Sequence, residues 1–107
     1  MRITKEGNLV TFINVFETRP EQQQVFIDHW IRFVEAAKGE PGMIGAVLHR
    51  STDGTRVVNY AHWRSEADLD TFEKKYTQFW EADHRPLILR ADPHTYEVIS
   101  LYERAES

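Results

Sequence analysis

The fold is decided by the stretch Ser51-Thr52-Asp53-Gly54-Thr55-Arg56-Val57-Val58-Asn59-Tyr60-Ala61-His62-Trp63. Its Asp-Gly pair is a strong hairpin signal, because a type I′ turn needs a positive φ at both central residues. In the strand that follows, successive side chains point to opposite faces of the sheet. One face therefore carries Val57, Asn59, Ala61 and Trp63, and the other carries Arg56, Val58, Tyr60 and His62.

The chain before this hairpin reads as a strand, a helix and a strand. Residues 8–17 are apolar on both faces, which is typical of a strand inside a sheet. Thr18 can cap the helix that follows, with Glu21 three residues later, and the helix is expected to end at Gly39-Pro41. Residues 43–51 form the next expected strand, and a two-residue turn places its His49 opposite Val58. One face of this strand carries Ile44, Ala46 and Leu48, and the opposite face carries Met43, Gly45, Val47 and His49.

The chain after the hairpin strand, residues 55–64, supplies one more helix and one more strand. Ser65 can cap the helix, whose buried stripe is Leu69, Phe72, Tyr76 and Phe79 with Trp80 beside it. We expect the helix to bend near residues 83–86, because the residue before a proline disfavours helical backbone. Alternation resumes after Asp92-Pro93 and predicts the last strand at residues 95–103, before a polar end at 104–107.

The order β-α-β-β-α-β predicts an α+β, ferredoxin-like protomer with a four-stranded antiparallel sheet and both helices on one face. Residues 1–107 are long enough for a single domain. Because the first and third strands are apolar on both faces, the face without helices would expose an apolar surface. A second copy packed sheet against sheet would cover it, so the sequence predicts a symmetric homodimer.

Composition and motifs exclude several classes of function. A net charge of −4 and the absence of any basic run argue against nucleic acid as the partner. Residues 1–7 hold no apolar signal core, and no run of about 18 apolar residues suggests a membrane span, so we expect a cytoplasmic protein. The chain has no Cys, no dinucleotide or phosphate-loop motif, and no spacing of its five His residues that seeds a metal site. We therefore expect no metal.

Asn59 is unusual in a strand otherwise rich in Val and Tyr. The amide offers donors and an acceptor, and the indole of Trp63 on the same face offers a donor. Such neutral groups suit the stabilisation of a developing oxyanion on a flat aromatic ligand. From the residue types alone, a hydrogen-bonded core Asn and a packing Trp remain the simpler interpretation.

The hairpin motif changes that balance, because Ser51-Thr52-Asp53-Gly54-Thr55-x-Val57-Val58-Asn59-Tyr60-Ala61-x-Trp63 resembles the corresponding hairpin of antibiotic biosynthesis monooxygenases. The resemblance implies a dimeric α+β barrel that oxidises a polycyclic phenol or anthrone to a quinone with O₂, without flavin, haem or metal. It places Asn59 and Trp63 in the substrate pocket as the catalytic pair. Leu69 stands where the family can carry a tyrosine, so the resemblance assigns no proton acceptor.

The proposed chemistry uses the substrate itself as the reductant of O₂. Asn59 would hold the phenolate or peroxide oxygen, and Trp63 would donate to a second oxygen. A dry pocket lined by Phe26, Trp30, Phe72 and Tyr76 would strengthen both hydrogen bonds.

Two alternatives remain open. Haem-degrading monooxygenases have a similar fold, and in that interpretation Asn14 and His84 fall at the haem-contacting positions, which adds both to the candidate pocket residues. The simpler interpretation of His84 is an exposed loop histidine before Pro86, and that of His62 is a residue of the dimer interface. The second alternative is a non-catalytic dimer that binds a small hydrophobic metabolite.

Overall fold

The computed structural model describes residues 9–105, so the expectations for residues 1–8 and 106–107 lie outside the described part of the chain. Four strands form one sheet: β1 (Val10–Glu17), β2 (Met43–Arg50), β3 (Arg56–Trp63) and β4 (Arg90–Tyr96). The helical segments are α1 (Pro20–Ala37), α2 (Glu66–Lys75), α3 (Thr77–Phe79), η1 (Trp80–His84) and η2 (Arg85–Leu87). The predicted β-α-β-β-α-β order is confirmed.

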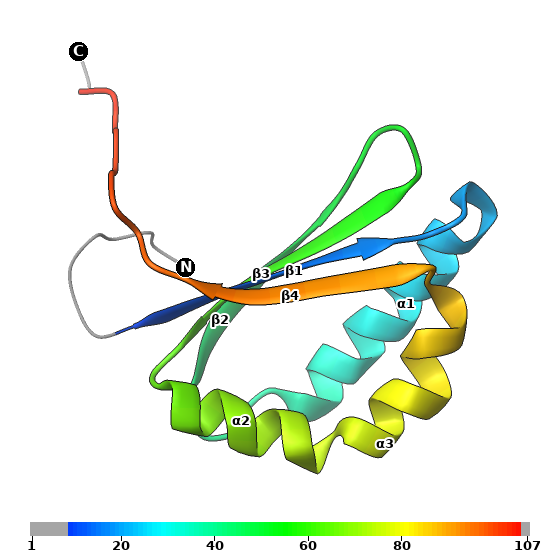
Figure 1. The fold of residues 1–107 in the computed structure, drawn as a ribbon, viewed down its shortest axis with the longest axis horizontal. Helices are drawn as coiled ribbons and strands as arrows, with labels where there is room; N and C mark the ends of the chain where they lie inside the picture. Colours follow the sequence, from blue (N-terminus) through cyan, green and yellow to red (C-terminus); the bar gives the residue numbers. More distant parts are fainter. Residues whose placement is uncertain (1–8, 106–107) are drawn as a thin grey trace.

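The sheet has the order β2-β3-β1-β4, and every neighbouring pair is antiparallel. β1 lies between two other strands, as its two apolar faces predict. The helical segments all lie on one side of the sheet (Figure 1). We call the sheet face that they cover the inner face; it carries Asn14, Phe16, Val57, Asn59 and Trp63.

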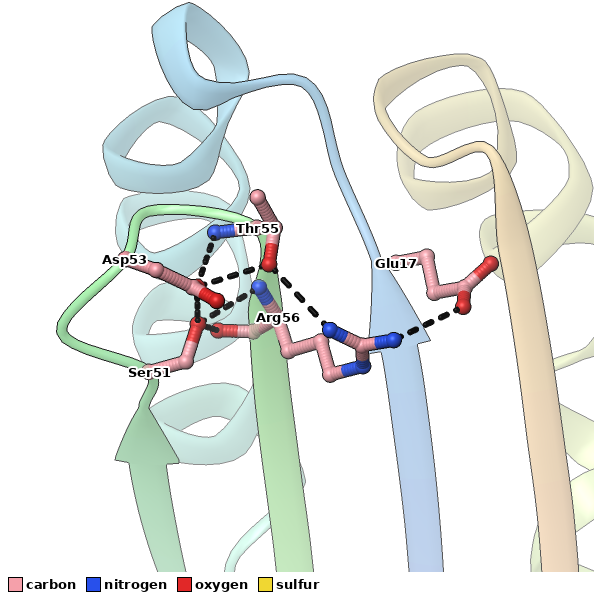
Figure 2. A network of polar contacts seen from close by, with 5 residues as sticks. All are labelled: Glu17, Ser51, Asp53, Thr55 and Arg56. Atoms are coloured by element: carbon pink, nitrogen blue, oxygen red, sulfur yellow. Dashed lines mark hydrogen bonds and ion pairs between the residues drawn. The ribbon is translucent and has the colours of Figure 1, made fainter.

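The hairpin has the predicted register, with His49 opposite Val58, but its turn differs from the predicted type I′. Of the two central residues of the turn, Gly54 has a positive φ, of 83°, whereas the φ of Asp53 is not positive. The Asp53 side chain stabilises the loop instead: its Oδ1 accepts from the hydroxyls of Ser51 and Thr55 at 2.7 Å and from the Thr55 N–H at 3.0 Å (Figure 2). The network continues through Arg56, whose Nη2 lies 3.5 Å from Oε1 of Glu17 at the end of β1.

The start of α1 also differs from expectation, because Thr18 does not cap it. Arg19 occupies the cap position and makes no side-chain cap bond. The Thr18 N–H instead donates to the Thr55 carbonyl at 2.8 Å, which draws this residue onto the hairpin. One turn further on, the buried Gln23 side chain donates to the carbonyls of Ser51 and Arg56 at 3.1 and 2.9 Å. These bonds attach α1 to the hairpin loop.

Strand β2 contains a bulge that changes its predicted faces. Met43 pairs with Trp63 and Gly45 with His62, so Ile44 is the extra residue. The bulge brings Met43 to the same face as Ala46, where both line a cavity, and leaves Ile44 54% exposed. The expectation that Ile44 shares a face with Ala46 and Leu48 is therefore wrong.

The second helix starts as predicted and ends in an irregular segment. Ser65 Oγ accepts from the Asp68 N–H at 3.1 Å, which confirms the expected cap. The α-helix stops at Lys75, well before Pro86, and η1 is a π-helix in which the Arg85 N–H donates to the Trp80 carbonyl. The wider turn buries His84, so the interpretation of His84 as an exposed loop residue is wrong.

The last strand begins earlier than predicted. β4 runs from Arg90 to Tyr96, and residues 97–105 have no regular structure. Asp92-Pro93, which was expected to precede the strand, lies within β4 because an edge strand tolerates proline. The Asp92 N–H donates to Asn14 Oδ1 at 3.1 Å, a side-chain bond that helps to hold this edge to β1.

Two buried apolar clusters lie between the sheet and the helices. The first contains Phe16, Phe26, Ile27 and Val57, and the second contains Ala61, Trp63 and Leu69. Phe16 is fully buried, and its ring centroid lies 4.8 Å from that of Phe26. The clusters occupy opposite ends of the inner face, and the residues between them line a cavity.

Candidate functional site

The candidate site is a cavity of about 310 Å³ between the inner face of the sheet and the helices. This volume lies at the lower end of the range of small-molecule pockets, about 300–1,000 Å³. The sheet supplies a floor that includes Asn14, Asn59, Ala61, Trp63 and Pro93. The helical segments supply walls that include Trp30, Phe33, Phe72, Tyr76 and His84. The cavity is therefore largely aromatic, with a few polar groups.

Two carboxamides lie side by side on the floor. Asn14 on β1 pairs directly with Asn59 on β3, so the strand register places both side chains on the same face at the same level. Asn14 Oδ1 accepts a backbone hydrogen bond from Asp92, whereas Asn59 Oδ1 is buried and has no hydrogen-bond partner within residues 9–105. A buried unpaired polar group is costly, so a ligand that donates a hydrogen bond to Asn59 would relieve that cost.

The aromatic side chains form a continuous wall around these amides. The Trp63 indole lies 4.9 Å from the Phe72 ring, which lies 4.7 Å from Tyr76, measured between ring centroids. Phe33 contacts both Phe72 and Tyr76 from α1, at 5.8 and 5.3 Å. Such a lining favours a flat apolar ligand over a charged one.

His84 reaches the cavity from η1. It is 1% exposed, and its Nε2 has no hydrogen-bond partner among the described residues. Burial lowers the pKa of the imidazole, although a backbone hydrogen bond with His29 acts in the opposite direction. His84 is therefore held as a neutral ring with one free nitrogen.

The ionisable groups near the wall have different roles. Tyr76 donates its hydroxyl to Glu40 Oε1 at 2.8 Å, and Lys75 Nζ lies 2.6 Å from the same oxygen. These contacts lower the pKa of Glu40, raise that of Tyr76 and tie the end of α2 to the loop before β2. Glu73 also lines the cavity, and its pKa is raised by burial and by Asp70.

The structure brings most of the candidate residues together. The following line the cavity: Asn14, Trp30, Asn59, Trp63, Phe72, Tyr76 and His84. Phe26 is the exception, because it is fully buried in the cluster with Phe16 and Val57. The sequence pattern could not separate the two positions, since Phe26 and Trp30 lie one turn apart on the same helix face.

Other lining residues were not anticipated. Phe33 lines the cavity from α1, Met43 reaches the floor through the bulge at Ile44, and Pro93 lies in a segment expected to precede the last strand. His62 is 2% exposed, and its Nε2 lies 3.1 Å from the Tyr60 hydroxyl. Within residues 9–105, no group of three His, Asp or Glu side chains lies close enough to hold a metal ion.

Comparisons with known proteins show which family the chain belongs to. The family model described as antibiotic biosynthesis monooxygenase matches residues 9–78, which include the hairpin, Asn59 and Trp63. The chain belongs to the antibiotic biosynthesis monooxygenase family. It is 45% identical over 68 residues to tetracenomycin-F1 monooxygenase from Streptomyces glaucescens. That alignment covers 63% of this chain and 61% of the relative, so the match spans about three-fifths of the relative's length.

Solved structures of this fold include enzymes with different named activities. The monooxygenase from ActVA-Orf6 of Streptomyces coelicolor, in complex with nanaomycin D, has a TM-score of 0.76 at 24% identity, covering 90% of this chain and 92% of that chain. The heme-degrader MhuD from Mycobacterium tuberculosis, with two hemes bound, has a TM-score of 0.68 at 23% identity, covering 88% and 99%. These similarities establish the fold. No helix in residues 9–105 is long and apolar enough to cross a membrane.

Proposed function

We propose that this protein is a cofactor-independent monooxygenase that oxidises a polycyclic phenol or anthrone to a quinone with O₂. The observation that carries the proposal is the buried, unpaired Asn59 Oδ1 in a cavity walled by Trp63 and Phe72. The 45% identity to tetracenomycin-F1 monooxygenase and the family match over the same hairpin support it.

The cavity fits the demands of this substrate class. A fused aromatic ring would lie against the Trp63 and Phe72 side chains, while its oxygen substituent would reach the amides of the floor. Oxygen and nitrogen of an Asn side chain exchange places when the amide rotates about its last bond, so Asn59 can accept from a phenol or donate to a phenolate. The same residue can therefore follow the oxygen as it loses its proton.

The chemistry proceeds from the substrate's own electrons. The deprotonated ring gives one electron to O₂, the two radicals combine at a ring carbon, and the resulting peroxide loses water to form the quinone. A dry aromatic environment strengthens the hydrogen bonds to the developing oxyanion, an effect worth about 10²–10³-fold in kcat for a single donor.

Oxygen uptake tests this proposal. Protein whose absorption spectrum shows no flavin or haem is mixed with a set of anthrones and naphthols, and O₂ consumption is measured beside quinone formation. We expect one O₂ consumed per quinone formed, with no added cofactor. Tight binding of a hydroxyanthraquinone without oxidation of any matching anthrone would instead identify a non-catalytic binding protein.

Haem degradation is the second candidate function, and the buried free nitrogen of His84 at the cavity is the observation that favours it. The position where a tryptophan would be expected for that activity carries Phe72. Addition of hemin distinguishes the two functions. A Soret band that His84→Ala removes would support haem binding, whereas the quinone-forming function predicts no such band.

We propose that the working unit is a symmetric homodimer. The sheet face opposite the helices carries Ile13, Val15, Val58 and Tyr60, and it holds none of the helical segments of residues 9–105 (Figure 1). A second copy packed on this face would bury these side chains. Sedimentation velocity should then give about twice the chain mass of 12.6 kDa, and Val58→Asp should shift the protein to a monomer.

A further inference from the structure

We propose that His84 Nε2 is the proton acceptor of this oxidation, taking the proton of the substrate's phenolic or enolic hydroxyl in the cavity. The inference rests on the proposed function and assigns the step for which the hairpin motif provides no residue. Asn59 and Trp63 are neutral over the ordinary pH range, so neither of them can serve as the base.

The hydrogen bonding of the ring leaves the correct nitrogen free. The backbone hydrogen bond with His29 raises the pKa of His84, which means that it favours the protonated ring. The ring therefore donates and the His29 carbonyl accepts. Because Nε2 is the nitrogen without a partner, we assign the proton of this bond to Nδ1. The neutral tautomer then presents a lone pair at Nε2.

The surroundings keep the ring neutral and fixed in place. Aromatic rings of α1, α3 and η1 pack around it, with centroid distances of 5.2–5.7 Å. Since burial disfavours the imidazolium, His84 stays unprotonated near neutral pH and is able to accept a proton. The π-helical turn that carries it is a geometry often found at functional sites.

Other ionisable groups face this region and bear on its pH dependence. From α1, His29 lowers the pKa of His84 by its charge, and from η1, Asp83 raises it. From α2, Glu73 lines the same cavity with a raised pKa, and the Tyr76 hydroxyl is bound to Glu40. Among the described residues, the sheet contributes the neutral Asn14 and Asn59 at this level. Of the described residues that line the cavity, Glu73 is thus the one competing base.

The proton balance closes over one turnover. The substrate O–H bond breaks and an N–H bond forms at Nε2, leaving a phenolate that reduces O₂ by one electron; the carbon and superoxide radicals then combine. The imidazolium protonates the peroxide and becomes a base again. Nε2 next takes the remaining proton from the same carbon, whose C–H electrons form the C=O bond as the O–O bond breaks. The released hydroxide takes that proton and leaves as water.

The test compares pH–rate profiles of O₂ uptake for the wild type, His84→Gln and Glu73→Gln. For the wild type we expect an acid limb in kcat/KM with an apparent pKa below the ordinary histidine value of 6.5. His84→Gln should lower kcat about 10²–10⁴-fold, the usual range for loss of a general base, and should remove that limb. Glu73→Gln should retain the acid limb of the pH–rate profile. His94→Gln, the matched control at an exposed histidine paired with Asp92, should retain it as well.

Chemical rescue separates catalysis from a packing role. Imidazoles added to His84→Ala should restore oxidation, with a rate that depends on the pKa of the added base; a packing role predicts dependence on its size alone. If the substituted proteins do not fold, nitrogen NMR of wild-type His84 replaces them. Binding of a hydroxyanthraquinone should shift the Nε2 resonance, and an unchanged resonance would overturn the proposal.

The two proposals fail in different ways. A wild type that oxidises anthrones while His84→Gln keeps both its rate and its acid limb overturns the role of His84 and leaves the proposed function standing. Loss of the limb in Glu73→Gln instead of His84→Gln has the same meaning. A wild type that oxidises no anthrone overturns the proposed function, and the role of His84 with it.

Discussion

Two neighbouring positions on the inner face of the sheet have opposite characters. Phe16 on β1 pairs with Val57 on β3, and both side chains are fully buried. Two residues further along the same strands, Asn14 pairs with Asn59, and both side chains lie on the floor of the cavity. Both pairs lie under the same helices and between the same two strands. The strand framework is therefore shared, and the side chains alone decide whether the space is filled or open.

The comparison shows how stability and function are divided in this domain. Around Phe16, the rings of Phe26, Trp30 and Trp80 pack at centroid distances of 4.8, 5.2 and 5.7 Å. Around Asn59, a side-chain oxygen is buried with no partner in the part of the chain that the structure describes. A cost of this kind is typical of a binding site, because the ligand supplies the missing hydrogen bond.

The largest effect is expected at the filled end. Phe16→Ala removes a fully buried ring and should lower the free energy of unfolding by about 3–5 kcal/mol, measured by urea denaturation. Residual folded protein should retain its affinity for an aromatic ligand, because Phe16 does not line the cavity. A small loss of stability together with abolished binding would show that the two positions are not separate.

At Asn59, beside the cavity, we expect an effect of intermediate size that falls on activity instead of stability. Asn59→Ala should reduce kcat about 10²–10³-fold with little change in stability, since its Oδ1 makes no hydrogen bond to any residue that the structure describes. Oxygen uptake and thermal melting are the measurements. Unchanged turnover would remove Asn59 from the mechanism.

Asn14→Ala is the matched comparison for that variant. Asn14 Oδ1 accepts from the Asp92 N–H, so the substitution removes one hydrogen bond to the edge strand β4 and should lower the free energy of unfolding by about 1 kcal/mol. The two amides, paired across the strands, should thus differ in which property they affect. Equal losses of stability in the two variants would contradict this difference.

The smallest effect is expected at the hairpin loop, whose residues 51–55 do not line the cavity. Hydrogen bonds from Thr55 and Ser51 lower the pKa of Asp53 to about 2 from the ordinary 3.8. Because the folded pKa is depressed, the ionised side chain stabilises the fold above pH 3.8, and this contribution is lost as the pH falls toward 2. Asp53→Asn should therefore lower the melting temperature slightly at pH 7 and hardly at all near pH 2. An equal difference at both pH values would contradict this assignment.

The sequence could predict those parts of the fold that depend on local patterns. Alternation identified β1 and β3, the Asp-Gly pair identified the hairpin and its register, and Ser65 identified the start of α2. The face shared by Asn59 and Trp63 followed from a period of two residues, which leaves little freedom once a strand is recognised.

The parts that could not be predicted depend on tertiary contacts. Asp92-Pro93 interrupts the alternation of the sequence, and its place on the edge of the sheet allows it to be part of a strand. The bulge at Ile44 adjusts β2 to β3, and Thr18 is drawn away from its cap by the carbonyl of Thr55. The sequence leaves His84 open between a pocket residue and an exposed loop histidine, because no periodicity signals the π-helical turn that carries it. Met43, next to the bulge, and His84 both line the cavity. The segments that the sequence could not predict therefore affect the cavity more than the fold.

The π-helical turn at Trp80–His84 makes the direction of His84 depend on the number of residues before it. Each residue of a regular helix advances the side-chain direction by about 100°, so removing one residue from this turn would swing the ring away from the interior by roughly that angle. Glu81 and Ala82 are both exposed, and exchanging either for another residue leaves the count intact. This segment can therefore vary in composition while its length stays constrained, the reverse of an ordinary surface loop.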